Sequence, residues 1–400
     1  MQLFEKGFLD YLQGLKFTCD IDAVPEGTLI FPYEPLLRVK GPIVQAQILE
    51  SVALNILNFQ TLIATKASRI VAAAEGNTVV EFGMRRAQGI DGAISASRAA
   101  YIGGCHSTSH VLAGKLFNIP LQGTQAHSWI MAFEEERSAF KAFAKAFPHH
   151  SVFLIDTYEA LQGIKNAIQV ADSLKKEGFH LLGVRLDSGD LARLSIEVRE
   201  LLDQAGYVKT AIMASNELDE HLIQDLKKQK ATITIWGVGT HLVTAKDQPA
   251  LDGVYKLTAI KKEGKPWEDK IKISEQKEKT TLPGLLQVRR FLHHDGSFLM
   301  DAIYDEKQVS FQGTVSVFNE DERRKIEKNY QYKDLLIPIF RKGKLVYTLP
   351  PLVKIRKKCQ EDLALLPSSM RRLLNPELYF IGLENDLFHK RLQLLQKRSK

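Results

Sequence analysis

The chain has 400 residues, of which 44% are hydrophobic and 25% are charged. These are ordinary values for a folded globular protein, so the composition excludes the intrinsically disordered and fibrous classes. The length fits two domains or one large barrel with additions. No apolar run approaches the length of a membrane span, and residues 1–6 lack the basic-then-apolar layout of a secretory signal.

Charge and cysteine content narrow the partners and the compartment. The formal net charge is +7, and much of the basic excess lies in short mixed runs that we interpret as solvated surface. The sequence has neither an RNA-binding signature nor interleaved aromatic and basic residues, so we expect no nucleic-acid partner. Cys19, Cys105 and Cys359 are far apart and form no CxxC pair. This spacing argues against a disulfide framework or a zinc site and favours a cytoplasmic protein.

Residues 1–75 are expected to form part of a β-rich flanking domain and a connecting helix. Turn residues at 24–28, 32–35 and 40–42 separate short apolar pieces, as in a small β-rich unit. The apolar stretch Ala46–Thr65 then predicts a single helix.

Residues 76–258 repeat one plan, in which a short apolar run ends in a polar or glycine-rich loop and a helical pattern follows. Strands that alternate with helices indicate parallel pairing, and about seven such units favour an α/β barrel over an open sheet. The predicted strands are Thr78–Phe82, Ile119–Leu121, Val152–Ile155, Leu181–Leu186, Thr210–Met213, Thr232–Trp236 and Gly253–Leu257.

The remainder of the chain has a different pattern. Residues 259–350 are expected to return to the β-rich domain, with strands at Lys270–Ser274 and Phe311–Val317. Residues 351–400 are expected to form a C-terminal helical tail. Asn385–Gln396 is amphipathic, and we expect this helix to dock on the protein body rather than on a membrane.

Polar side chains and glycines follow consecutive strands of the predicted barrel. Catalytic residues of barrel enzymes lie at the carboxyl ends of the strands, so these segments are expected to meet at one rim. The segments occupy residues 83–86, 123–127, 156–158, 187–190, 215–217 and 237–240.

Two of these segments are typical of phosphate binding. Gly237 and Gly239 would let backbone N–H groups turn toward a phosphate, and the Thr240 hydroxyl adds a donor. Arg85 and Arg86 directly follow a strand, and the planar guanidinium matches phosphate with two hydrogen bonds. An ion pair at the rim is the alternative interpretation of the two arginines.

Carboxylates and histidines give further candidates. Asp187 and Asp190 could both face one site, as Mg²⁺ ligands or as partners of sugar hydroxyls. Asp190 could instead cap the helix that begins at the next residue. His127 closes a glycine-led loop, either as a catalyst or as a satisfied polar group. His106 and His110 stand one helical turn apart, but no HExxH context predicts a metal site there.

No GxSxG elbow, P-loop or Rossmann fingerprint is present. The parts favour a polyanionic phosphate substrate with Mg²⁺ and no nucleophilic triad. They fit a reaction at an anomeric carbon whose leaving group is pyrophosphate, which depends mainly on positioning and electrostatic stabilisation.

The sequence resembles the nicotinate phosphoribosyltransferase family along nearly its whole length. The matching segments are Glu81–Gly89, Gly123–Trp129, Gly183–Asp190, Ala214–Asp219, Gly237–Thr240, Gly253–Leu257, Lys272–Glu275 and Lys279–Gly284. The resemblance implies an irregular type II phosphoribosyltransferase barrel, TIM-like, with a β-rich flanking domain, acting as a homodimer. It also implies that nicotinate, phosphoribosyl pyrophosphate and ATP, with Mg²⁺, give nicotinate mononucleotide in NAD salvage.

The resemblance also implies roles for single residues. His127 is expected to be transiently phosphorylated by ATP, and Thr124 and Arg185 to contact nicotinate, with the arginine pairing its carboxylate. Thr240 is expected to contact phosphoribosyl pyrophosphate, helped by Gly237 and Gly239. The remaining candidates in the catalytic mouth are Arg85, Asp187, Ser215 and Asn216.

Two departures from the family pattern leave alternatives open. The chain starts at a segment resembling the family's Phe-Leu-Asp-Tyr-Leu, Phe8–Leu12, downstream of an expected Asp-x-Tyr-x-x-Thr-Met motif. Gly103–His110 also differs from the usual Gly-Gly-Phe-Asp-x-Thr-Ser-Asn. The alternatives are a truncated, catalytically impaired relative, or an enzyme for another pyridine base such as nicotinamide or quinolinate. Arg185 argues against nicotinamide, which is neutral.

Overall fold

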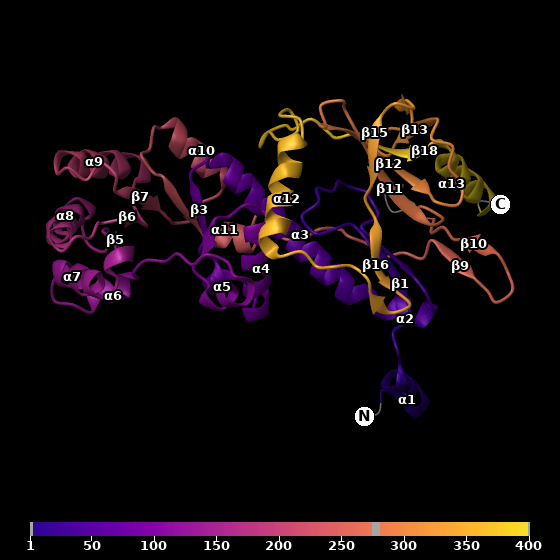
Figure 1. Cartoon of the computed structure of the whole chain (residues 1–400), viewed down its shortest axis with the longest axis horizontal. Helices are drawn as coiled ribbons and strands as arrows, with labels where there is room; N and C mark the ends of the chain where they lie inside the picture. Colours follow the sequence, from indigo (N-terminus) through magenta and orange to yellow (C-terminus); the bar gives the residue numbers. More distant parts are fainter. Residues whose placement is uncertain (1–2, 274–280, 399–400) are drawn as a thin grey trace. The chain divides into compact units, whose positions relative to one another are not determined.

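The structure is a computed structural model that describes residues 3–273 and 281–398 (Figure 1). The chain divides into two compact units, one formed by Met1–Ile56 with Gly253–Lys400 and the other by Leu57–Asp252. Helix α3 (Glu50–Ala73) begins in the first of these ranges and ends in the second.

The first unit is rich in strands, as expected. A six-stranded sheet has the order β14-β13-β18-β12-β11-β15, a four-stranded sheet has the order β17-β16-β1-β2, and β9 pairs with β10. The elements are α1 (Lys6–Gly14), β1 (Asp20–Ala23), β2 (Leu37–Lys40), α2 (Ile43–Ile48), β9 (Ala259–Lys261), β10 (Trp267–Asp269), β11 (Leu286–Leu292), β12 (Phe298–Asp305), β13 (Gly313–Ser316), β14 (Arg323–Lys325), β15 (Gln331–Asp334), β16 (Ile337–Arg341), β17 (Lys344–Leu345), α12 (Leu352–Leu365), β18 (Ile381–Glu384) and α13 (Asn385–Arg398).

The six-stranded sheet buries one face under α13. Val288, Ile303 and Ile381 of the sheet form a fully buried cluster with Leu387 and Phe388 of the helix. The amphipathic helix predicted at Asn385–Gln396 is therefore confirmed, and it docks on the protein because its apolar stripe completes this core. The predicted strand Phe311–Val317 is confirmed as the shorter β13. Lys270–Ile273 is not a strand, while Ser274, Glu275, Lys279 and Thr280 lie outside the described residues.

The second unit alternates strands and helices. Its elements after α3 are β3 (Thr78–Glu81), η1 (Met84–Arg86), α4 (Ile90–Ile102), β4 (Ser107–Thr108), α5 (Val111–Phe117), α6 (His127–Met131), α7 (Glu136–Ala146), η2 (Pro148–His150), β5 (Val152–Leu154), α8 (Ala160–Lys176), β6 (Gly183–Leu186), α9 (Leu191–Gln204), β7 (Ala211–Ala214), α10 (Glu220–Lys228), β8 (Ile235–Val238) and α11 (Thr240–Val243). All six strands pair in parallel in the order β4-β3-β8-β7-β6-β5.

The predicted α/β class is confirmed, with two corrections to the strands. Ile119–Leu121 contributes only an isolated bridge between Thr108 and Leu121, because Pro120 has no N–H to donate to a ladder. Gly253–Leu257 forms no strand, and Val254 is 69% exposed. The edge strand β4 was not predicted, since Ser107 and Thr108 carry no apolar pattern. The parallel sheet ends at β4 and β5 and is thus a half-barrel.

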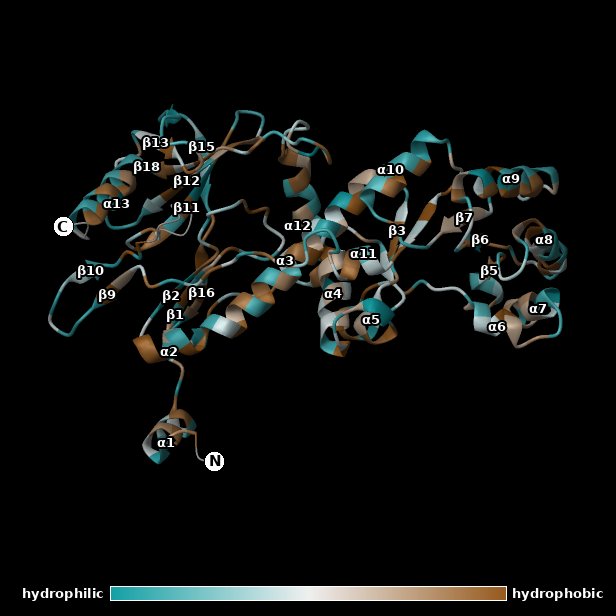
Figure 2. Ribbon diagram, turned by 180° about the vertical axis from the view of Figure 1, so that it is seen from behind, coloured by the Kyte–Doolittle hydropathy of each residue, from teal (hydrophilic) through white to brown (hydrophobic). Residues whose placement is uncertain are grey.

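The predicted single helix Ala46–Thr65 is divided between α2 and α3, and α3 extends it at the C-terminal end to Ala73. Residues 43–73 form a helical stretch that is long and apolar enough, by length and composition alone, to cross a membrane. The expectation that no stretch of this kind exists is therefore corrected. The later half of α3 is a core helix, because Ile63, Ala67 and Ile70 are fully buried in the second unit. Figure 2 shows hydrophobic residues along α2 and α3 mixed with hydrophilic ones.

A buried ion pair joins neighbouring strands in the first unit. Arg290 on β11 and Asp301 on β12 are both fully buried, with Nη2 of the arginine 2.6 Å from Oδ2 of the aspartate. The Tyr379 hydroxyl donates to Oδ1 of Asp301 at 2.9 Å, and Phe31 stacks on the tyrosine ring. Removing one charge of such a pair leaves the other buried without compensation.

We predict that Asp301→Asn destabilises the protein by about 3–5 kcal/mol, measured as the free energy of unfolding in denaturant. The matched control is Arg193→Ala, which removes an exposed pair with Glu197 and should cost no more than about 0.5 kcal/mol. Equal losses for the two variants would contradict this account of the buried pair.

Candidate functional site

Arg185 is the centre of the polar cluster at the carboxyl ends of the parallel strands. It lies near the end of β6, and its side chain is only 13% exposed. Its Nε donates to Ser215 Oγ at 2.9 Å, beyond β7. Its Nη1 donates to Thr124 Oγ1 at 2.6 Å and to the Gln125 carbonyl at 3.1 Å. One guanidinium therefore connects the loop that contains Thr124 and Gln125 to the loop that follows β7.

Asp187 is the acidic partner of this arginine. Its Oδ1 lies 3.2 Å from Nη2 of Arg185 and also accepts a hydrogen bond from the Ser215 hydroxyl. Burial raises the pKa of the Asp187 carboxyl, but the Arg185 charge and the Ser215 hydrogen bond outweigh burial, so the pKa lies below its ordinary value. Asp187 is therefore a stable carboxylate at neutral pH.

His127 lies beside this ion pair, at the start of α6. Its Nε2 is 3.4 Å from Oδ2 of Asp187, and its Nδ1 is 3.1 Å from Oγ1 of Thr157. The imidazole is 39% exposed, so solvent and ligands reach it. The structure thus brings together five of the predicted residues, Thr124, His127, Arg185, Asp187 and Ser215.

The loop after β5 holds the Asp187 segment in place, and sequence reasoning assigned it no role. Asp156 is 9% exposed, and its Oδ2 accepts from the Asp187 backbone N–H and from the Ser188 hydroxyl, both at 2.7 Å. A similar brace is Gln125, whose side-chain oxygen accepts from the Leu154 N–H at 3.0 Å. The only sequence signal for Asp156 was its place directly after a strand.

Thr240 and Asn216 lie at the ends of neighbouring strands, away from the hydrogen bonds of Arg185. The Thr240 hydroxyl donates to Glu217 Oε1 at 3.0 Å, and the carboxylate also lies 3.3 Å from Nε2 of His241. Asn216 and Glu217 have φ of 100° and 37°, in the left-handed region that non-glycine residues rarely adopt. Backbone of this kind clusters at functional sites.

The glycines of this segment are explained partly by packing. Gly237 is inside β8, where an added Cβ would lie 2.9 Å from Cε of Met213 and 3.0 Å from the Phe82 ring. At Gly239 an added Cβ would lie 3.1 Å from the Phe82 carbonyl oxygen. A side chain at either position would therefore crowd the neighbouring strand end, whether or not a ligand is bound.

Arg85 and Asp190 lie at exposed positions. Arg85 is in the short helix η1 and makes no hydrogen bond or ion pair with any residue in the described ranges 3–273 and 281–398. Asp190 caps α9, with its Oδ1 accepting from the Arg193 N–H at 3.0 Å. Within the same ranges, no three His, Cys, Asp or Glu residues are grouped so as to hold a metal ion.

A buried carboxylate supports the loop that carries Arg85. Glu81 is 1% exposed and accepts from the backbone N–H of Gly83 and from the hydroxyls of Ser97 and Thr108, at 2.7 and 2.6 Å. Nδ1 of the buried His110 lies 3.2 Å from the Ser97 hydroxyl. His106 points elsewhere, because its Nδ1 accepts from the Val79 N–H. The two histidines are thus parts of separate structural contacts.

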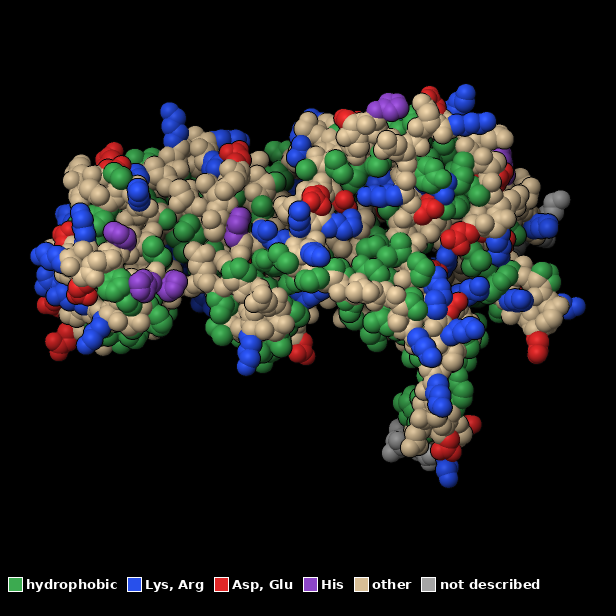
Figure 3. All heavy atoms as spheres, viewed as in Figure 1, with side chains coloured by type: hydrophobic (Ala, Val, Ile, Leu, Met, Phe, Trp, Pro, Cys, Tyr) green, Lys and Arg blue, Asp and Glu red, His purple; other side chains and the backbone are tan. Residues whose placement is uncertain are grey.

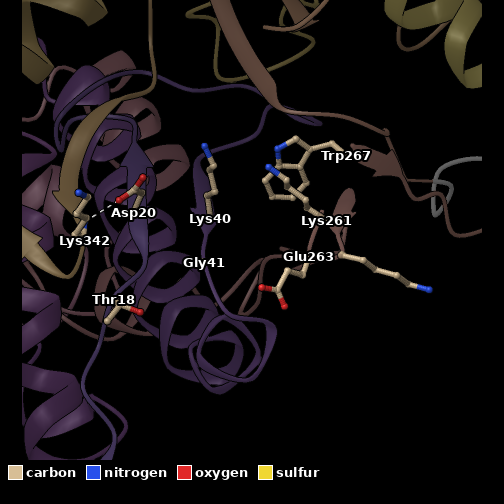
Figure 4. A pocket seen from close by; sticks show the side chains of 9 residues that line it. Thr18, Asp20, Lys40, Gly41, Lys261, Glu263, Trp267 and Lys342 are labelled. Atoms are coloured by element: carbon tan, nitrogen blue, oxygen red, sulfur yellow. Dashed lines mark hydrogen bonds between the residues drawn. The ribbon is translucent and has the colours of Figure 1, made fainter. Parts of the chain in front are cut away.

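A basic cleft of about 380 Å³ lies in the first unit and contains none of the predicted site residues. Its lining includes Lys40, Lys261, Lys262 and Lys342, with Trp267 beside them (Figure 4). Nζ of Lys40 lies 5.9 Å from the centre of the Trp267 ring. The chemistry-bearing side chains are instead those on the parallel sheet of the second unit.

The lowered pKa of Asp187 predicts a pH dependence of stability. In the unfolded chain the carboxyl has its ordinary pKa of about 4, and above this pH the ionised group contributes its full stabilisation of the folded state. This contribution is lost as the pH falls through the lower pKa of the folded state. We expect the stability difference between the parent and Asp187→Asn, measured by unfolding at a series of pH values, to shrink on acidification. Asp190→Asn, which keeps a capping oxygen, should follow the parent; a difference for Asp187→Asn that stays constant with pH would contradict the prediction.

Comparison with known proteins identifies the family. Residues 1–58, 78–322 and 286–391 match the N-terminal domain, the family profile and the C-terminal domain of nicotinate phosphoribosyltransferase. The chain is 44% identical to "Nicotinate phosphoribosyltransferase" of Bacillus subtilis, covering 94% of this chain and 77% of that protein, and 33% identical to that of Homo sapiens, covering 96% and 81%. The crystal structure of human Nicotinic Acid Phosphoribosyltransferase superimposes with a TM-score of 0.84 at 30% identity, covering 98% and 85%. The chain therefore belongs to the nicotinate phosphoribosyltransferase family.

Proposed function

We propose that the protein joins nicotinate to phosphoribosyl pyrophosphate, giving nicotinate mononucleotide and pyrophosphate with ATP hydrolysis, in NAD salvage. The observation that supports this most strongly is the half-buried cluster of Arg185, Asp187 and His127 at the strand ends of a chain from this family. An inert relative would have no need to keep these three groups in hydrogen-bond and ion-pair contact at an accessible rim.

Arg185 suits the carboxylate of nicotinate. A guanidinium has five N–H donors. One on Nε faces Ser215, two on Nη1 face Thr124 and the Gln125 carbonyl, and one on Nη2 faces Asp187, which leaves one N–H on Nη2. A nicotinate carboxylate would accept that N–H, and the adjacent Thr124 hydroxyl could reorient toward it. The neutral amide of nicotinamide could accept a hydrogen bond here but would form no ion pair with Arg185.

The phosphoribosyl group would bind along the neighbouring strand ends. Thr240 offers a hydroxyl, Gly237 and Gly239 permit close approach of backbone, and Ser215 and Asn216 follow β7 next to them. The guanidinium of Arg85, which is unpaired among the described residues, lies on an adjacent loop and suits the pyrophosphate. These groups match a substrate that carries phosphate at both ends of a ribose.

Magnesium would enter with the pyrophosphate, because Mg²⁺ is usually held by substrate phosphates and one or two carboxylates. Asp190 fits this use, since its capping bond engages only Oδ1, and Asp187 could share the ion. When bound, the ion would neutralise charge on the leaving pyrophosphate.

Bond formation needs little proton transfer. The pyridine nitrogen attacks the anomeric carbon with its free lone pair while the bond to the pyrophosphate oxygen breaks. No general base is required, so the protein contributes the orientation of the two substrates and charged groups around them. The Arg185–Asp187 pair would orient the base, and the phosphate contacts would orient the sugar.

Coupling to ATP would pass through His127. The imidazole is accessible, and its ring nitrogens are oriented by Thr157 and Asp187. Phosphorylation of this ring would store the free energy of ATP close to the bound substrates. A neutral imidazole is a good nucleophile near pH 7.

We also propose that the protein is a homodimer and that it is cytoplasmic. Ile48, Val52 and Ile56 are 48%, 61% and 51% exposed and follow one another at four-residue spacing along a helix. Apolar residues are also exposed on α5, where Figure 3 shows hydrophobic atoms at the surface. Contiguous exposed apolar side chains mark association surfaces. The three cysteines are free and buried, which suits a reducing compartment.

We predict that His127→Ala abolishes the stimulation of nicotinate mononucleotide formation by ATP, while a slower transfer without ATP remains measurable. The matched control is His180→Ala, an exposed histidine away from the cluster, which should keep the ATP effect. Product formation is measured by chromatography with and without ATP. ATP stimulation that survives in His127→Ala would disprove the phosphohistidine assignment.

We further predict that Arg185→Lys lowers kcat/KM for nicotinate by about 10- to 150-fold, because a lysine cannot reproduce the charge-assisted fork. Nicotinate, nicotinamide and quinolinate are assayed side by side with the parent and the variant. The parent should use nicotinate best. A parent that prefers nicotinamide would show that Arg185 does not read the carboxylate.

A further inference from the structure

The two ring nitrogens of His127 have chemically different neighbours. Nε2 faces the Asp187 carboxylate at 3.4 Å, and Nδ1 faces the Thr157 hydroxyl at 3.1 Å. The contact with Thr157 is a hydrogen bond and the contact with Asp187 is an ion-pair contact, and the ring has no other polar contact within residues 3–273 and 281–398. A neutral imidazole has one N–H and one lone pair, so these two neighbours decide which nitrogen can act as a nucleophile.

Asp187 selects the hydrogen on Nε2. A carboxylate that is ion-paired with Arg185 has no proton to donate and can only accept a hydrogen bond. It therefore faces an N–H, and the lone pair is left on Nδ1. A hydroxyl can either donate or accept, so the Thr157 O–H donates to this lone pair and completes the arrangement.

The two residues that precede Thr157 are held in place. Asp156 holds the Asp187 segment through the two 2.7 Å hydrogen bonds. Ile155 packs closely against α8 at Gly163, where an added Cβ would lie 1.9 Å from the Ile155 carbonyl oxygen. The Asp156–Thr157 dipeptide thus fixes the partner of Nδ1 directly and the partner of Nε2 through the Asp187 backbone.

We propose that Thr157 is a positioning residue for the phosphorylation of His127, whose hydroxyl fixes the orientation of the ring and keeps the lone pair on Nδ1 until the phosphoryl group takes its place. This inference rests on the proposed ATP-coupled function and adds to it a residue that acts on the reactive histidine. Thr157 itself forms no bond to phosphorus.

The Nδ1 lone pair attacks the γ-phosphorus of ATP, the nitrogen–phosphorus bond forms, and the bond from phosphorus to the bridging oxygen breaks. ADP leaves with that electron pair. The hydrogen on Nε2 stays in place, and the positive charge that the ring acquires is offset by Asp187. The Thr157 hydroxyl, released from the lone pair, then donates to an oxygen of the transferred phosphoryl group.

The test compares Thr157→Val, which has nearly the same shape without the hydroxyl, with Thr157→Ser, which restores it. Full-length parent and variants are mixed with γ-labelled ATP and Mg²⁺, and the rate of acid-labile, alkali-stable labelling is followed over a range of ATP concentrations. We expect Thr157→Val to label about 10- to 100-fold more slowly. The ATP concentration for half-maximal rate should change by no more than about twofold, because orientation rather than nucleotide binding is lost.

Thr157→Ser should label within about threefold of the parent, since it regains the hydrogen bond. A Val variant as fast as the parent, or Val and Ser variants slowed equally, would overturn the role of the hydroxyl. Thr157→Ala supplies the same comparison if thermal unfolding shows that the Val variant does not fold. A parent that is not labelled, with product formation indifferent to ATP, would instead remove the proposed coupling and this inference with it.

Discussion

The ion pair of Arg185 and Asp187 is the constraint around which the candidate site is arranged. Two residues at the end of a single parallel strand carry opposite charges 3.2 Å apart, and each has further partners from other loops. Ser215 contacts both side chains, Thr124 contacts the arginine, and His127 contacts the aspartate. Without the pair, three loops that are distant in sequence would lose their common anchor.

This arrangement links the open parallel sheet to the chemistry. The strand ends of β5, β6 and β7 lie side by side because these strands pair in parallel register. Two buried polar side chains support these strand ends. Asp156 accepts a hydrogen bond from the Asp187 N–H, and Gln125 accepts one from the Leu154 N–H. Fixed loops of this kind suit a reaction in which a neutral pyridine nitrogen attacks an anomeric carbon. In such a reaction, orientation and fixed charges provide most of the catalytic effect.

Sequence patterns predicted the elements with a strong local signal. The apolar runs of β3, β5, β6, β7 and β8 and the stripe of α13 follow from periodicity and burial. Periodicity could not find β4, which has two polar residues, and it misassigned Gly253–Leu257, whose apolar residues are partly exposed. Because Ile119–Leu121 also forms only an isolated bridge, the parallel sheet, with β4 added, has six strands in place of the seven that were predicted.

The site was predicted less completely, for a physical reason. The family resemblance named His127, Arg185 and Asp187, and His127 and Asp187 also lie in loops that follow predicted strands. Thr157 contacts His127, 30 positions earlier, and Asp156 contacts Asp187, 31 positions later. No local sequence pattern identifies partners at such separations. Gly237 was assigned to phosphate binding, and the structure adds that an added Cβ there would crowd Met213 and Phe82.

The central claim is that one rim of the half-barrel binds a carboxylated pyridine beside a pyrophosphorylated sugar. Mass spectrometry of the products that the purified protein makes from isotope-labelled nicotinate and phosphoribosyl pyrophosphate tests this claim most directly. The account predicts labelled nicotinate mononucleotide and an equal amount of pyrophosphate. Consumption of neither substrate, with or without ATP and Mg²⁺, would contradict it.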